Sequence, residues 1–129
     1  MSNKTINYIN QLIDKISRDK QENATYELNH NLEFSKMTKK QMLKRGNYIY
    51  GINQDTLKDI YINLIFFIET FQDMEHLHLG KWKDPQTNKI IIEIVKFEFD
   101  KDKAIQQAKK YKQKAIYDIV NNQDIFINE

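Results

Sequence analysis

Helical spacing of hydrophobic residues is clearest in two parts of the chain. Residues 3–20 carry an apolar stripe at intervals of three and four positions, made of Ile6, Ile9, Leu12, Ile13 and Ile16. Residues 56–75 keep this spacing and are also apolar on the other sides, which is typical of a buried helix. We therefore predict an amphipathic N-terminal helix and an apolar central core helix. If the central helix keeps apolar surface exposed, it becomes a dimer or partner face instead.

Capping residues indicate two more helices. Thr38 and Gln41 have the spacing of a capping box, and Gly46 is suited to end the short helix that follows. Asp100 is a good N-cap for a second helix, in which small alanines permit close packing on a sheet. The lysines at the end of that helix suit the negative end of its dipole.

Alternating and β-branched residues predict the strands. Residues 90–99 are densest in β-branched and aromatic side chains, and apolar residues on both faces at the start indicate a central strand. Further patterns predict strands at 24–34, 47–52, 115–120 and 125–127. Asn29–Asn31 interrupts the first of these as a bulge or turn, and a turn signal joins the last two into a hairpin.

Together these elements predict one small α+β domain over residues 1–129. We expect a sheet of about four to five strands, packed by the central helix. Residues 82–127 should form a C-terminal strand-helix-strand unit. The segment His76–Gly80 is interpreted as a polar segment at a helix end.

A spaced set of residues in the C-terminal part carries a family resemblance. Its positions are Leu79, Gly80, Trp82, Asp84, Thr87, Lys89, Ala104, Ala108, Gln113, Ala115, Ile116, Asp118, Asn122 and Ile125. This set resembles a recurrent C-terminal module of small, uncharacterised bacteriophage and mobile-element proteins, written Gly-x-Trp-x-Asp-x-x-Thr-Gly-Lys and then Gln-x-Ala-Ile-x-Asp. The earlier residues are unmatched.

The resemblance implies a phage or mobile-element origin and structural roles for the matched residues, but no activity. Trp82 is expected to pack, Asp84 to shape a turn, and Gln113 and Asp118 to hold strand ends. The chain departs from the pattern at Asn88, where glycine is usual. Asparagine tolerates a left-handed backbone, so we expect the turn to survive.

Composition excludes several classes of function. The chain has no cysteine, which removes disulfides, thiol catalysis and cysteine-ligated metals. The N-terminal segment is amphipathic and does not resemble a signal peptide. The apolar run at 60–68 is about half a membrane span. We expect a cytoplasmic protein of the host cell that does not enter a membrane. A net charge of +2 argues against a DNA mimic.

No residue set predicts a catalytic, cofactor-binding or metal site. His76 and His78 with Glu75 form the nearest approach to a metal site, although the two histidines diverge on a helix and converge only in extended structure. Glu93 lies inside an apolar strand and is the most unusual candidate for a catalytic carboxylate. A hydrogen-bonded strand carboxylate is the commoner meaning. The three glycines are too scattered to build a phosphate-binding loop.

Two basic clusters are the remaining candidates for contact with a partner or nucleic acid. One lies around the short helix, and its site residues are Lys39, Lys40, Lys44, Arg45, Tyr48 and Tyr50, with Lys36 nearby. The other comprises Lys101, Lys103, Lys109, Lys110, Lys112 and Lys114. A basic helix near exposed aromatics is suited to grip a phosphate backbone. Alternatively, these lysines only keep the protein surface solvated and bind no phosphate.

These features predict a phage-type accessory protein that binds a host protein stoichiometrically. The specific hypothesis is an anti-CRISPR-like inhibitor of a bacterial defence nuclease, since the chain has 7 Tyr and 7 Phe and aromatics favour interfaces. The alternatives are a nucleic-acid-binding regulator that uses the Lys36–Arg45 face and a small hydrolase acting on a nucleotide signal. Homodimerisation through the central helix or a sheet edge is also compatible with the sequence.

Overall fold

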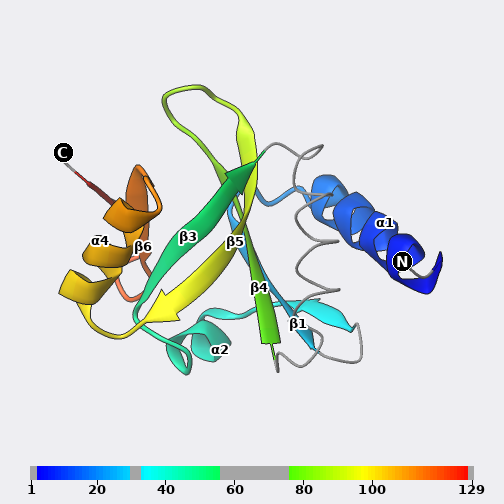
Figure 1. The fold of residues 1–129 in the computed structure, drawn as a ribbon, viewed down its shortest axis with the longest axis horizontal. Coiled ribbons are helices and arrows are strands. Elements are labelled where there is room, and N and C mark those ends of the chain that lie inside the picture. Colours follow the sequence, from blue (N-terminus) through cyan, green and yellow to red (C-terminus); the bar gives the residue numbers. More distant parts are fainter. Residues whose placement is uncertain (1–2, 30–32, 56–75, 128–129) are drawn as a thin grey trace. The chain divides into compact units, whose positions relative to one another are not determined.

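The computed structural model describes residues 3–29, 33–55 and 76–127. They form an α+β fold with an antiparallel sheet of seven strands, in the order β2-β1-β4-β5-β3-β6-β7, and three helices (Figure 1). The predicted fold class is therefore confirmed, and the sheet is larger than predicted. The predicted central helix at 56–75 lies outside the described residues.

Helices and strands are interspersed along the described part of the chain. The helices are α1 (Asn3–Arg18), α2 (Lys39–Leu43) and α4 (Lys101–Lys110). The strands are β1 (Ala24–Asn29), β2 (Phe34–Lys36), β3 (Tyr48–Asp55), β4 (His76–Lys83), β5 (Ile90–Glu98), β6 (Ala115–Asp118) and β7 (Gln123–Phe126). The predicted central strand is β5, which is the fourth of the seven strands across the sheet.

The chain divides into two compact units. Unit 1 comprises residues 1–36 and 55–92, and unit 2 comprises residues 37–54 and 93–129. Strand β5 contributes its first residues to unit 1 and the remainder to unit 2.

In unit 1, α1 packs on the face of the sheet formed by β1, β2 and β4. Its apolar stripe is buried as predicted, with Ile9 and Leu12 completely inaccessible. The Tyr8 ring meets Phe34 of β2 edge to face, with ring centroids 5.9 Å apart. Near the C-terminal end of α1, Lys81 of β4 donates from Nζ to the carbonyl oxygen of Ile16 at 2.9 Å. These contacts hold the middle and the C-terminal end of the helix against the strands.

The interpretation of His76–Gly80 as a helix end is wrong, because this segment belongs to β4. Leu77 and Leu79 lie opposite Leu28 and Tyr26 of β1 in an antiparallel register. His78 lies opposite Glu27, and its Nε2 is 3.0 Å from the Glu27 Oε1. The alternation of leucine with histidine is thus the two-residue periodicity of a strand. His78 has the Glu27 carboxylate as its cross-strand partner.

The N-terminal strand predicted over residues 24–34 is two strands. β1 ends at Asn29 and β2 begins at Phe34, and the two pair antiparallel with Leu28 opposite Phe34. The predicted interruption at 29–31 therefore separates the two arms of a hairpin. This division and β4 together raise the strand number to seven.

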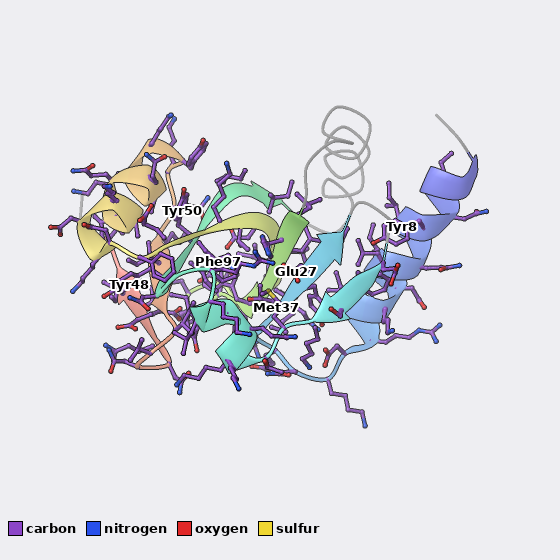
Figure 2. All side chains as sticks on the ribbon, turned by 90° about the horizontal axis from the view of Figure 1, so that it is seen from below. Tyr8, Glu27, Met37, Tyr48, Tyr50 and Phe97 are labelled. Atoms are coloured by element: carbon purple, nitrogen blue, oxygen red, sulfur yellow. The ribbon has the colours of Figure 1, made fainter. Side chains whose placement is uncertain are left out.

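In unit 2, hydrophobic clusters form on both faces of the sheet. On one face, Tyr50 is buried with Ala104 and Ala108 of α4 and with Ile116 of β6. On the other face, Ile49, Val95 and Ile119 form a second cluster, against which Met42 and Leu43 of α2 pack. The alternation of β3 side chains sends Tyr50 toward α4 (Figure 2) and Ile49 toward α2.

The C-terminal elements agree closely with prediction. Asp100 caps α4, accepting at Oδ1 from the Lys103 amide at 3.1 Å, and the helix runs to Lys110. Strand β6 ends at Asp118, two residues before the predicted end. The Asp118 carboxylate accepts from both the backbone and the side-chain amide of Asn121, at 3.2 and 2.7 Å. These bonds turn the chain toward β7.

The turn before β5 has the conformation expected from its residues. Asn88 adopts a left-handed backbone with φ 61°, so asparagine fills the position where the resembling module has glycine. Asp84 is almost fully buried and accepts at Oδ1 from the Gln86 amide at 2.9 Å. The Asn88 amide donates to the Asp84 carbonyl at 2.7 Å and closes the turn.

Candidate functional site

One end of unit 2 brings three chain segments together around Asn47. The Asn47 amide donates to the carbonyl of Glu98 at 3.1 Å, which joins the start of β3 to the end of β5. The Asn47 carbonyl accepts from the Ile119 amide at 3.0 Å, which adds the β6–β7 turn. Helix α2 therefore lies beside the β5–α4 junction and this turn (Figure 1).

The short helix α2 is held by its cap and by its apolar side. Thr38 Oγ1 accepts from the Gln41 amide at 3.2 Å, and Gln41 Oε1 accepts from the Thr38 amide at 2.9 Å, so the predicted capping box is present. Gly46 then allows the chain to pass against β5, because a Cβ there would lie 2.7 Å from the Glu98 backbone nitrogen. With Met42 and Leu43 on the second cluster, the basic residues of this segment face solvent.

Exposed apolar side chains lie on either side of Asn47. Phe99 is the first residue of the β5–α4 junction, and its side chain is 57 % exposed. Val120 in the β6–β7 turn is 52 % exposed. Lys39 connects α2 to this turn, donating from Nζ to the Val120 carbonyl at 3.1 Å. We call this region the α2 surface; its exposed residues are Lys39, Lys40, Lys44, Arg45, Phe99 and Val120.

Carboxylates near the α2 surface are used to shape the backbone. Glu98 Oε1 accepts from the amides of Phe99 and Asp100, at 3.0 and 3.2 Å. Asp100 caps α4. Hydrogen bonds from Asn121, and a smaller effect of the nearby positive charge of Lys101, lower the pKa of Asp118.

The predicted basic and aromatic site residues occupy two different environments. Lys39, Lys40, Lys44 and Arg45 are all exposed on and after α2. Tyr48 is half-buried and Tyr50 is buried against α4, both on the opposite face of the sheet (Figure 2). Burial, with smaller effects of Tyr111 and Glu98, raises the Tyr50 pKa. Tyr50 is therefore a core residue, and the exposed aromatic side chain of the α2 surface is Phe99.

The nearby Lys36 belongs to unit 1. Its Nζ donates to Asp19 Oδ2 at 2.8 Å. In unit 2, the second basic cluster lies along and after α4, where Lys101, Lys103, Lys109, Lys110, Lys112 and Lys114 are exposed. Unit 2 carries eleven Lys and Arg residues against seven Asp and Glu, whereas unit 1 carries nine against eleven. The excess of positive charge is thus concentrated in unit 2.

Glu93 is the most unusual carboxylate of unit 2. It is only 7 % exposed and lies over Gly51, where a Cβ would collide with its carboxylate. A Cβ on Gly51 would also lie 2.8 Å from the Oε1 of Gln113, so the glycine leaves room for this side chain as well. Gly51 therefore provides the space for two buried polar side chains. This arrangement fits the interpretation of Glu93 as a structural strand carboxylate and not as a catalytic one.

Within residues 3–29, 33–55 and 76–127, no cluster of three or more His, Asp or Glu residues could hold a metal ion. His78 is bonded to Glu27, and His30 lies outside the described residues. No helix in the described part of the chain is long and apolar enough to cross a membrane.

Three important residues were not identified from the sequence. Lys81 is buried and bonds carbonyls at the end of α1. Phe99 and Val120 are exposed although their sequence context is apolar. The strand pattern of β4 contained the signal for Lys81, since alternation puts it on the same face as Leu77 and Leu79. The exposure of Phe99 and Val120 depends on where β5 and β6 end, which the sequence left uncertain.

Comparisons with known proteins identify no relative: no protein family, curated protein or solved structure matches this chain. The site must therefore be interpreted from its own geometry.

Proposed function

We propose that this protein acts by stoichiometric binding to a host protein, as an accessory protein of a bacteriophage or mobile element. The specific form we propose is inhibition of a bacterial defence nuclease. The observation that supports the binding role is the α2 surface, where exposed Phe99 and Val120 stand among cationic side chains. The phage origin is supported by the resemblance of the C-terminal residues, and the defence target extends that origin.

The composition of the α2 surface suits a protein interface. Such interfaces combine a desolvated apolar centre, often with an aromatic side chain, and a polar rim. Phe99 and Val120 supply apolar area, and Lys39 and Lys40 of α2 with its C-cap residue Lys44 supply a charged margin. The capping box and the bonds of Asn47 hold these segments in place before a partner arrives. Preorganisation of this kind lowers the entropic cost of binding.

Nucleic-acid binding through the Lys36–Arg45 face is the second candidate. It is favoured by the exposure of Lys39, Lys40, Lys44 and Arg45 on one short segment. Such residues neutralise phosphates, so binding should weaken steeply as salt increases. Charge reversal at these four positions would abolish the activity if this candidate were right.

Affinity capture from lysate of the bacterial host separates the two candidates. Tagged protein is incubated with lysate, with and without nuclease treatment, and captured proteins are identified by mass spectrometry. We expect one protein to be enriched in both samples, and native mass spectrometry of the purified complex to give a fixed stoichiometry. Enrichment that vanishes with nuclease would favour nucleic acid. Substoichiometric turnover of a substrate would contradict the binding role.

A further inference from the structure

We propose that the α2 surface recognises an acidic protein segment that carries an apolar anchor residue. This inference rests on the proposed binding function and adds the chemistry of the partner and the residues that contact it. The anchor would pack against Phe99 and Val120, while its flanking Asp or Glu residues would face the ammonium groups of Lys40 and Lys44.

The apolar centre of this surface is supported by exposure and by position. Phe99 and Val120 are the most exposed large hydrophobic residues in the described part of the chain, at 57 and 52 %. Both are tied to Asn47, since its Nδ2 donates to the Phe99 carbonyl at 3.5 Å and its backbone carbonyl accepts from Ile119, the neighbour of Val120. Their backbones are thus fixed, and a partner would meet an ordered apolar contact.

The charge of the surface selects for carboxylates in the partner. Lys39, Lys40, Lys44 and Arg45 are exposed around α2. The carboxylates of Glu98 and Asp118, which are close in sequence to Phe99 and Val120, accept hydrogen bonds from neighbouring amide groups. Positive charge is therefore presented outward, while these negative groups are held by the backbone. An acidic partner would gain both association rate and specificity from this complementarity.

Two features favour a protein partner over a nucleic acid. Val120 is aliphatic, and an aliphatic side chain has no aromatic face on which a base can stack. Glu98 and Asp100 also flank Phe99 in the chain, and Asp118 lies two residues before Val120, so their negative charge opposes a continuous phosphate backbone at the apolar residues. A protein segment with separated carboxylates can avoid them. The interspersed charges therefore fit an acidic, partly apolar protein surface.

A defined peptide provides the direct test. The probe is a synthetic peptide that alternates Asp or Glu with Leu and Phe, added to the isotope-labelled full chain and followed by amide NMR signals. We expect saturable shifts at Asn47, Phe99 and Val120. Oligothymidylate and a peptide with Lys in place of the acidic residues serve as ligand controls, and neither should produce saturable shifts there.

Paired variants locate the contacts. Phe99→Ser and the double change Lys40→Glu with Lys44→Glu should each weaken peptide binding by about tenfold or more. Phe126→Ser is the matched apolar control, because Phe126 is 48 % exposed on β7. Lys109→Glu with Lys112→Glu is the matched charge control. Both lysines are exposed, Lys109 in the last turn of α4 and Lys112 just after the helix. Neither control should change the affinity more than about twofold.

The inference is overturned if the acidic peptide causes no saturable shift at these amides. It is also overturned if oligothymidylate binds there more tightly than the peptide, or if the control variants weaken binding as much as the test variants. Amide spectra of the free variants that differ from wild type only near the substituted residues show that the fold is retained. Failure of this inference remains distinct from failure of the proposed function: a protein captured from lysate equally by wild type and Phe99→Ser would contradict only the α2 surface.

Discussion

Lysine has opposite roles at two places in the molecule, one in each unit. In unit 1, Lys81 is buried, and its Nζ donates to the carbonyls of Ile16 and Asp19, at 2.9 and 2.7 Å. In unit 2, Lys40 and Lys44 of the α2 segment are exposed. The same side chain thus closes a helix end in one unit and meets solvent in the other.

This difference separates residues that hold the fold from residues available for recognition. A buried ammonium group must have hydrogen-bond partners, because an unsatisfied buried charge is costly. Lys81 meets that condition with helix carbonyls that would otherwise lack donors. An exposed lysine has no such constraint and contributes little to stability. Removing the charge of Lys81 should therefore destabilise the protein, whereas removing the charges of Lys40 and Lys44 should weaken binding.

The largest effect is expected from Lys81→Met. The change keeps the length and apolar stem of the side chain but leaves the Ile16 and Asp19 carbonyls without their donor. We expect the free energy of unfolding to fall by about 3 kcal/mol, measured by chemical denaturation. Lys40→Met is the matched control and should change it by less than about 0.5 kcal/mol. Equal stability of the two variants would contradict the structural role of Lys81.

A smaller effect is expected from Gly46→Ala, which tests how closely α2 approaches β5. The added methyl group would meet the Glu98 backbone, with the nitrogen 2.7 Å and the oxygen 2.9 Å away. Backbone yields less easily than a side chain, so we expect a loss of about 2 kcal/mol. Gly51→Ala meets side-chain atoms of Glu93 and Gln113 instead and should cost less. The reverse order in denaturation experiments would contradict this packing.

Removal of the α2 cap should have a still smaller effect on stability. Thr38→Ala deletes the hydroxyl that accepts from the Gln41 amide, which should cost about 1 kcal/mol. Thr38→Ser keeps an acceptor and should restore most of the loss. Because the cap orders the α2 surface, Thr38→Ala should also weaken partner binding, as measured by titration. Unchanged stability in Thr38→Ala would show that the packing of Met42 and Leu43 alone holds the helix.

The smallest effect is expected in acid, and it concerns unit 1. The Lys36 ammonium, then the Tyr26 hydroxyl and the Gln21 amide, hold the pKa of Asp19 well below its usual range. A lowered folded-state pKa contributes stability that is present above the unfolded pKa, about 4, and is lost as pH falls below it. Asp19→Asn should therefore flatten the acid side of a stability-versus-pH curve. A curve parallel to wild type below pH 4 would contradict this role.

Much of the fold could be predicted from local chemistry. The Thr38–Gln41 capping box, the Asp100 N-cap and the alanines of α4 all appear as expected, because each depends on residues close in sequence. Strand β4 was missed because its histidines look polar until Glu27 is placed opposite His78 by the β1 pairing. That pairing joins residues far apart in the chain, and the local sequence carries no direct sign of it.

The candidate site was predicted only in part. The α2 cations follow directly from the sequence, since lysines on a short capped helix tend to face water. The tyrosines were expected to accompany them, yet Tyr50 alternates to the opposite face and packs beneath α4. Phe99 takes the exposed position because β5 ends at Glu98, whose carboxylate accepts from the next two amides.

The most direct test of the α2 surface as the binding surface is quantitative capture from parallel host lysates with Phe99→Ser and Phe126→Ser. Both changes replace an exposed phenylalanine of unit 2, and only the first lies on the α2 surface. We predict that Phe126→Ser retains the partner protein at the wild-type level, whereas Phe99→Ser loses most of it. Equal capture by both variants would contradict the account and move the binding surface elsewhere on the molecule.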